Sequence, residues 1–266
     1  MGFVNYEIIK HELPDNMKWL ENRTILLTRT GSHAYGTNTP QSDLDYKGIC
    51  IPPPEYYLGL KSINEYNTSG GKNFTKNVAG DIDVVVTHIN KFVRDAMNGV
   101  PNNLDILFTR EQDIIYCDDF GRELLSMRKE FLSKALKHKF CGYAHSQKHK
   151  MIIKKGNGTG RQELVDKYGY DTKFGMHTVR LLTNVIEILE TQNYCTYRPN
   201  REYLMDIRNG KYTLDELFEI IDDLEQKVES LYETSELQYS CDFNKINNWL
   251  IDFNRRALDY DWGDKS

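Results

Sequence analysis

Residues 31–45, GSHAYGTNTPQSDLD, lead from one apolar segment that reads as a buried strand, residues 24–30, into another, residues 44–51. Gly31 lets the backbone approach a ligand closely, because glycine has no Cβ and tolerates positive φ. A turn or short helix opening at Ser32 would direct backbone N–H groups and a hydroxyl at an anion. The stretch therefore predicts a phosphate-binding turn between two strands, with Gly31 and Ser32 as contacts.

Carboxylates follow this turn. Asp43 and Asp45 lie at the start of the second strand, and residues 81–87, DIDVVVT, predict a third strand that contains Asp83. Alternation puts Asp43 and Asp45 on one strand face, roughly 6.5–7 Å apart at the backbone, where they repel unless a cation lies between them. A D-x-D pair alone more often marks a solvated turn, but the Gly-Ser turn upstream favours a metal site. We predict Asp43, Asp45 and Asp83 as catalytic metal ligands for two Mg²⁺ ions, or Mn²⁺, and Asp81 stays an alternative third carboxylate.

The second half of the chain has mainly helical patterns. One helix is expected at residues 88–98, and after residue 118 the strand signals fade. Apolar residues then recur at helical spacing, which predicts helices at about 119–128, 131–154, 171–192, 214–235 and 243–258. The chain therefore divides into a catalytic head over residues 1–125 and a helical, substrate-binding part over residues 126–266.

A row of titratable side chains is expected on one of these helices. Lys173, His177 and Arg180 are spaced by four and three residues and so share one helix face. Such a row could be an exposed basic stripe, but the residues between them are apolar, so the helix is expected to be largely packed. Because a partly buried cationic row needs an anion, we predict that it contacts a nucleotide triphosphate. Tyr35, beside the Gly-Ser turn, would stack on the base or pack internally.

Charge is segregated along the chain, although the formal net charge is only −5. Residues 131–162 hold eight Lys/Arg and no acidic residue, whereas residues 213–242 hold ten Asp/Glu and one Lys. The basic segment either forms a solvated helix face or binds phosphates. On the second interpretation, the predicted nucleic-acid contacts are Lys148, Lys150, Lys154, Lys155 and Arg161.

Composition excludes several classes of protein. No apolar run among the 266 residues is long enough to span a membrane, and the first ten residues lack a signal-peptide pattern. The five cysteines include no C-x-x-C pair, which disfavours a disulfide framework or a zinc site. We expect a soluble, cytoplasmic protein with reduced thiols and no membrane partner.

The two central motifs resemble the GS…D-x-D signature of the polymerase beta nucleotidyltransferase superfamily. The longer string GSHAYGTNTPQSDLDYKGICIPP is similar to one branch, the RNA repair pathway DNA polymerase beta family of bacteria and phages, often encoded beside RNA ligases. Residues 90–108 are similar to that family's helix-plus-strand, residues 168–182 to its K-x-x-x-H-x-x-R helix, and residues 197–217 to its C-terminal block. The resemblance covers residues 24–250.

The resemblance implies a fold and a reaction. The fold would be an α/β (α+β) head with a mixed sheet, followed by a mainly helical C-terminal domain. The reaction would transfer a nucleoside monophosphate from an NTP such as ATP to an acceptor hydroxyl, with release of pyrophosphate. The acceptor would be an RNA or tRNA 3′ end in RNA repair, with an RNA ligase as pathway partner, in a bacterial cell or phage-infected host. Two alternatives stay open: nucleotidylation of a protein or small molecule, as in toxin–antitoxin systems, and an inactive nucleotide-binding module.

Overall fold

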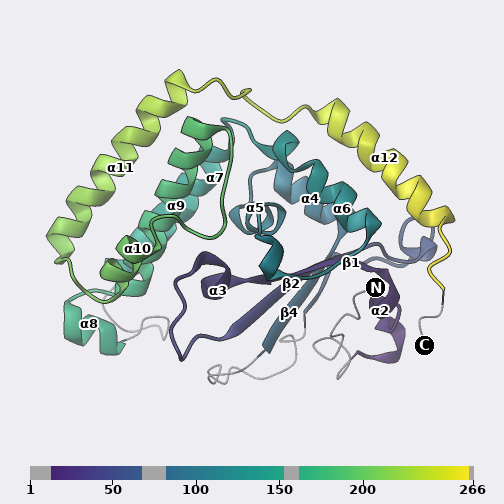
Figure 1. The fold of residues 1–266 in the computed structure, drawn as a ribbon, viewed down its shortest axis with the longest axis horizontal. Coiled ribbons are helices and arrows are strands. Elements are labelled where there is room, and N and C mark those ends of the chain that lie inside the picture. The colour runs from purple at the N-terminus through teal and green to yellow at the C-terminus, as the bar shows by residue number, and fades with distance from the viewer. Residues whose placement is uncertain (1–12, 68–81, 153–161, 264–266) are drawn as a thin grey trace.

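A mixed five-stranded sheet is the centre of the computed structural model, which describes residues 13–67, 82–152 and 162–263 (Figure 1). The strand order is β3-β4-β2-β1-β5; β2 and β4 run parallel, and the other neighbouring pairs are antiparallel. The mixed sheet and its three predicted strands are confirmed. The strands are β1 (Thr24–Thr30), β2 (Leu44–Cys50), β3 (Glu65–Asn67), β4 (Ile82–His88) and β5 (Ile114–Cys117).

Helices dominate the rest of the described chain, and Figure 1 shows the longer ones gathered on one side of the sheet. The short helix α3 (Gly31–Tyr35) sits at the end of the central strands, while α2 (Leu20–Arg23) lies against the opposite face of the sheet, where Leu20 joins a small apolar cluster. The remaining helices are α4 (Ile89–Met97), α5 (Pro101–Leu107), α6 (Asp119–Ser126), α7 (Leu136–Ile152), α8 (Gln162–Tyr168), α9 (Thr172–Thr191), α10 (Arg201–Arg208), α11 (Leu214–Thr234) and α12 (Phe243–Asp259).

One expectation about residues 90–108 is wrong. The segment after α4 is a helix, α5, and the strand comes later as β5. Pro101 occupies the first turn of α5, where its missing N–H and fixed φ favour a helix start. Leu104 and Leu107, three residues apart, are both fully buried, which fits helical rather than strand periodicity.

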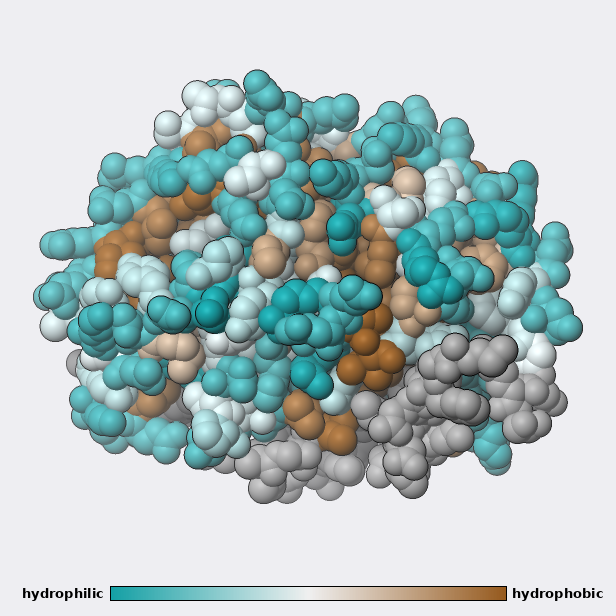
Figure 2. Space-filling view, in the orientation of Figure 1, coloured by the Kyte–Doolittle hydropathy of each residue, from teal (hydrophilic) through white to brown (hydrophobic). Residues whose placement is uncertain are grey.

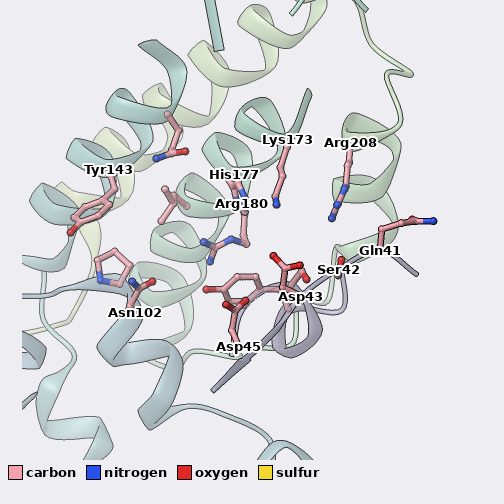
Figure 3. Close-up of a pocket in the computed structure, with 16 residues that line it drawn as sticks. Gln41, Ser42, Asp43, Asp45, Asn102, Tyr143, Lys173, His177, Arg180 and Arg208 are labelled. Atoms are coloured by element: carbon pink, nitrogen blue, oxygen red, sulfur yellow. The ribbon is translucent and has the colours of Figure 1, made fainter. Parts of the chain in front are cut away.

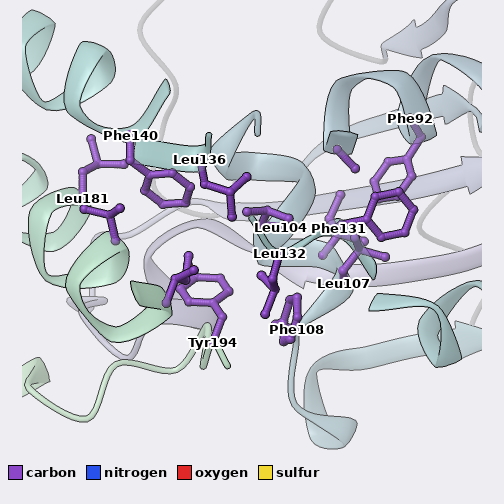
Figure 4. Packing of buried hydrophobic residues seen from close by; sticks show 14 of the residues in the cluster. Phe92, Leu104, Leu107, Phe108, Phe131, Leu132, Leu136, Phe140, Leu181 and Tyr194 are labelled. Carbon is purple, nitrogen blue, oxygen red and sulfur yellow. The ribbon is translucent and has the colours of Figure 1, made fainter. Parts of the chain in front are cut away.

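One apolar core runs through both halves of the chain, from Ile25 in β1 to Trp262 after α12. Figure 4 shows part of this core, with Phe92 from the first half and Phe140 and Leu181 from the second. The last helix returns to the head, since the rings of Phe120 in α6 and Phe253 in α12 lie 5.2 Å apart. The division at residues 125 and 126 stays a prediction, because the core is continuous across it and α12 packs on the first half.

The opposite charges of the two segregated segments meet in the fold. Lys148 of α7 donates to Asp222 and Glu225 of α11, at 2.9 and 3.3 Å, and Lys137 of α7 pairs with Glu229. α11 turns its apolar residues inward, and hydrophilic side chains cover most of the face seen in Figure 2. Much of the basic character of α7 is therefore matched to a neighbouring helix.

His88 at the end of β4 makes stability depend on pH. Its Nδ1 accepts the backbone N–H of Asn90 at 3.0 Å and so caps α4, and burial, aided by Arg94, lowers its pKa from 6.5 to about 4. Because the pKa of His88 is lower in the folded protein than in the unfolded chain, the neutral ring stabilises the fold at pH values above 6.5. This stabilisation is lost as the pH falls from 6.5 towards 4, where the unfolded chain binds a proton more readily. We expect a loss of about 2 kcal/mol, since one unit of pKa shift corresponds to about 1.4 kcal/mol and solvent screening weakens the effect.

Urea unfolding measured between pH 7.5 and 4.5 tests this expectation. His88→Asn is the matched variant, because asparagine caps a helix and does not titrate. Its stability should fall less steeply with acid than that of the wild type, and identical slopes would exclude His88 as a cause.

Candidate active site

The Gly-Ser turn and the carboxylates lie at one end of the central strands because of the strand pairing. Antiparallel pairing of β1 with β2 puts Thr30, the residue before Gly31, opposite Asp45. Parallel pairing of β2 with β4 puts Asp83 beside Asp45 in register. Three motifs from different parts of the sequence therefore meet at one site.

Gly31 is required at its position for two reasons. Its φ is +66°, in the left-handed region, and a Cβ added there would lie 2.1 Å from Oδ2 of Asp45. The backbone of the turn thus packs directly against the carboxylate, at a distance that any other residue would prevent.

Gly31→Ala should lower activity by about 100-fold, because displacing a reacting group by about 1 Å has that effect. The control is Gly169→Ala, since Gly169 also has positive φ, +83°, but a Cβ there would meet nothing within 4 Å. Both variants should lose about 1–2 kcal/mol of stability to backbone strain. If Gly169→Ala lost as much activity, measured by nucleotide incorporation, contact with Asp45 would not be the cause.

The pKa of Asp45 is raised by its surroundings in the site. Burial raises its pKa, and the charges of Asp83 and Asp43 raise it further, while Lys47 and Lys173 act in the opposite direction. The carboxylates of Asp83 and Asp43 are therefore close enough to disfavour the ionised form of Asp45, and a bound cation would relieve this repulsion.

The donor set suits a hard cation such as Mg²⁺, which prefers carboxylate oxygens and retains waters and substrate phosphates as ligands. Within the described residues, however, no three His, Cys, Asp or Glu side chains converge closely enough to hold a metal ion by themselves. The prediction that Asp43, Asp45 and Asp83 are metal ligands therefore stays a prediction. The residues fit a metal that shares its coordination with substrate.

A pocket of about 390 Å³ opens above Asp43 and Asp45. Figure 3 shows Lys173 of α9 and Arg208 of α10 across the pocket from the carboxylates, with Tyr143 and Asn102 at the other end. Of the predicted site residues, the following line it together: Gly31, Ser32, Tyr35, Asp43, Asp45, Lys173, His177 and Arg180. Asp83 is next to Asp45 in the sheet but is not part of this lining.

Arg180 and Tyr35 form the floor of the pocket. The guanidinium carbon of Arg180 lies 3.9 Å from the centre of the Tyr35 ring, and the Arg180 side chain is only 7% exposed. Its Nε and Nη1 are buried and have no hydrogen-bond partner among the described residues. Tyr35 itself is 6% exposed and packs rather than offering an open stacking face.

Asp105, which the sequence did not single out, holds this floor in place. It accepts hydrogen bonds from Tyr35 Oη at 2.6 Å and from Tyr194 Oη, and its Oδ2 lies 4.0 Å from Nη1 of Arg180. The carboxylate is 3% exposed and joins α5, α3, α9 and the segment after α9. Burial raises the pKa of both tyrosines, which keeps them neutral donors.

Other pocket residues also escaped the sequence interpretation. Arg208 donates to the carbonyl of Thr37 at 2.6 Å, which fixes it over the carboxylate end. The sequence feature that could have identified Arg208 as a site residue is its position within residues 197–217, which resemble the C-terminal block of the family. Gln41, Ser42 and Asn102 are further polar lining residues of this kind. Tyr143 and Gln147 also line the pocket, and they lie on the basic helix that the sequence predicts to contact phosphates or nucleic acid.

The predicted nucleic-acid contacts have different outcomes. Lys148 is occupied by its ion pairs with α11 and does not line the pocket, because the acidic helix lies alongside it. Lys150 is exposed, with its amine 5.9 Å from the ring centre of Phe174. Lys154, Lys155 and Arg161 lie outside the described residues, as does Asp81.

The mixed sheet, its adjoining carboxylates and the Gly-Ser turn define a nucleotidyltransferase of the polymerase beta type. The family model for the RNA repair pathway DNA polymerase beta family matches residues 7–252, and the chain belongs to that family. Its family and its fold are those of polymerase beta-type nucleotidyltransferases.

Individual relatives are more distant. A protein of Enterobacteria phage T4, described as an uncharacterized 38.9 kDa protein in the nrdC-mobD intergenic region, is 30% identical over 135 residues, which are 50% of this chain and 40% of the phage protein. The chain thus matches less than half the length of that relative.

Two solved structures share the general class. Spectinomycin adenyltransferase AAD(9) from Enterococcus faecialis, solved with ATP and spectinomycin, is 14% identical with a TM-score of 0.37, covering 96% of this chain and 98% of its own. A nucleotidyltransferase-like protein from Exiguobacterium sibiricum 255-15 is 11% identical with a TM-score of 0.28, covering 80% and 69%. Neither likeness is close enough to bear on the site of this chain.

Two further features do not involve the site. No two of the five cysteines form a disulfide. In the part of the chain that the structure describes, no helix is both long and apolar enough to cross a membrane.

Proposed function

We propose that this enzyme transfers a nucleoside monophosphate from an NTP, in a Mg²⁺-dependent reaction, to a hydroxyl at an RNA 3′ end. The observation that carries the proposal is the pocket itself, with carboxylates on one side and cationic side chains on the other. The triphosphate lies between them, since it must be bound by cations and neutralised near the aspartates.

Each side of the pocket has a proposed role. Lys173, His177 and Arg208 face the phosphates, and Arg180, which also lines the pocket, adds positive charge. The uncharged end, with Asn102, Tyr143 and Gln147, receives the nucleoside.

The carboxylates serve the reacting groups. Asp43 and Asp45 would hold Mg²⁺ together with the substrate phosphates, and Asp83, beside Asp45, would receive the acceptor hydroxyl and help to remove its proton. The oxygen then bonds to the α-phosphorus as the bond to pyrophosphate breaks. Bound Mg²⁺ supplies charge neutralisation and a lower pKa of the attacking hydroxyl.

An RNA acceptor is favoured by the family to which the chain belongs, whose description places it in RNA repair. We further propose that it acts in the cytoplasm of a bacterial cell or phage-infected host, in one pathway with an RNA ligase. Residues 1–125 would carry the reaction and residues 126–266 would bind the nucleotide.

Incubation with Mg²⁺ and each α-labelled NTP tests the proposal, with total tRNA, nicked tRNA, DNA and cell lysate offered as acceptors. Label in RNA that depends on Mg²⁺ supports it. Asp43→Asn is the matched variant, since it removes one charge and keeps the side-chain shape, and it should abolish the signal. Label in a protein band would favour protein nucleotidylation instead, and no incorporation with any acceptor would contradict the proposal.

A further inference from the structure

A second pocket, of about 400 Å³, lies on the other side of α3 from the active site. Gly31, Ser32 and Tyr35 of α3 face the active site, whereas His33 and the following Gly36 face the second pocket. Its lining is almost wholly polar and consists of Arg29, His33, Gly36, Asn38, Arg110, Gln112, Asp113 and Tyr197.

The charges in this pocket do not cancel. Arg110 donates to Oδ2 of Asp113 through Nε at 2.8 Å and Nη2 at 2.7 Å. The charge of this buried carboxylate is therefore neutralised by Arg110 alone. Nη1 of Arg29 is 3.8 Å from the other oxygen of Asp113, beyond hydrogen-bond length. Two arginines face one carboxylate, which leaves the pocket positive.

Two side-chain nitrogen atoms in the pocket lack hydrogen-bond partners. Nε of Arg29 and Nε2 of His33 are buried and have no hydrogen-bond partner among the described residues. Buried polar groups are normally satisfied, so an unpartnered pair beside one cavity suggests a ligand that accepts hydrogen bonds. Arg29 lies in β1 and His33 in α3, which follows β1 directly in the chain.

The wall opposite these nitrogen atoms is fixed. The guanidinium carbon of Arg110 lies 3.5 Å from the centre of the Tyr197 ring. A Cβ at Gly36 would lie 2.5 Å from Cε2 of Tyr197, and the φ of Gly36 is +74°. Only glycine allows this approach, so the pocket is built before any ligand binds.

We propose that this pocket binds a phosphate group, with Arg29 and His33 donating to its oxygens and Arg110 adding positive charge. A phosphate is favoured over an apolar carboxylic acid or a base because the lining offers donors and almost no apolar surface. The phosphate belongs either to a nucleic-acid strand, which rests on the proposed RNA acceptor, or to a small phosphorylated molecule.

The first test is a titration with inorganic phosphate, followed by NMR of protein labelled in its histidine rings. His33→Asn identifies the His33 signal. The signal should shift saturably in the wild type, and Arg29→Gln should raise the apparent Kd by about tenfold, as for loss of one phosphate contact. Arg255→Gln, at an exposed position on α12, is the matched control and should leave the Kd unchanged.

The second test measures binding of labelled single-stranded RNA by fluorescence anisotropy at several salt concentrations. If Arg29→Gln weakens RNA binding and lowers the salt slope by about one, the phosphate belongs to the strand. If only the phosphate titration changes, the ligand is a small phosphorylated molecule. If His33 does not respond to phosphate, or responds equally in Arg29→Gln, the proposal is wrong, whatever the outcome of the NTP incorporation assay.

Discussion

Asp45→Asn should reduce nucleotide incorporation by about 1000-fold or more, which corresponds to about 4 kcal/mol of transition-state stabilisation. Asp45 is the carboxylate on which the other site elements converge: Asp83 pairs with it in the sheet, Gly31 packs on it, and Lys173 acts on its charge. Asparagine keeps the shape but removes the charge that would hold Mg²⁺ and oppose the cationic wall. The measurement is kcat/KM for incorporation of labelled NTP.

The same variant should be no less stable than the wild type in the absence of divalent ions. Burial and the neighbouring carboxylates raise the pKa of Asp45, so its ionised form destabilises the fold at neutral pH. Stabilisation by added Mg²⁺ with NTP should be lost as well. Asp119→Asn, at a side chain 94% exposed, serves as control and should change neither quantity. Activity within tenfold of the wild type would remove Asp45 from the proposed reaction.

Asp105→Leu should destabilise the protein by about 3–5 kcal/mol, the usual effect of removing one partner of a buried charged network. The substitution leaves the hydroxyls of Tyr35 and Tyr194 without their acceptor and the buried guanidinium of Arg180 without a nearby negative charge. Urea unfolding provides the measurement. Tyr35→Phe, which removes one hydroxyl and leaves the carboxylate, should lose only about 1 kcal/mol.

A rescue experiment separates loss of charge compensation from loss of packing. In Asp105→Leu/Arg180→Met the uncompensated cation is gone, so part of the lost stability should return, although nucleotide transfer should not. If Asp105→Leu unfolded within 1 kcal/mol of the wild type, or the double variant were the sum of its parts, the network would not have the proposed role.

Local patterns were sufficient to predict much of the fold. Strand β1 was predicted over the residues it occupies, and β2 and β4 to within one residue at each end, because β-branched and apolar runs end at glycine or proline. Helices α9, α11 and α12 were predicted to within one or two residues from apolar spacing. The helix within residues 100–108 was not predicted, since a short buried apolar run is compatible with either a strand or a helix. Its packing against neighbouring elements determines which of the two forms.

By itself, the sequence determined the reaction class, because Gly31-Ser32 and Asp43-x-Asp45 carry it within fifteen residues. Only the tertiary structure decided which distant residues complete the site. Asp105 meets Tyr35 and Tyr194 across 70 and 89 residues, and Arg208 meets Thr37 across 171. The tertiary structure also decided that Lys148 forms an ion pair with the acidic helix α11, so this side chain is not available to a nucleic acid. These contacts depend on how helices and strands pack, and packing joins side chains whose spacing along the chain carries no periodic signal.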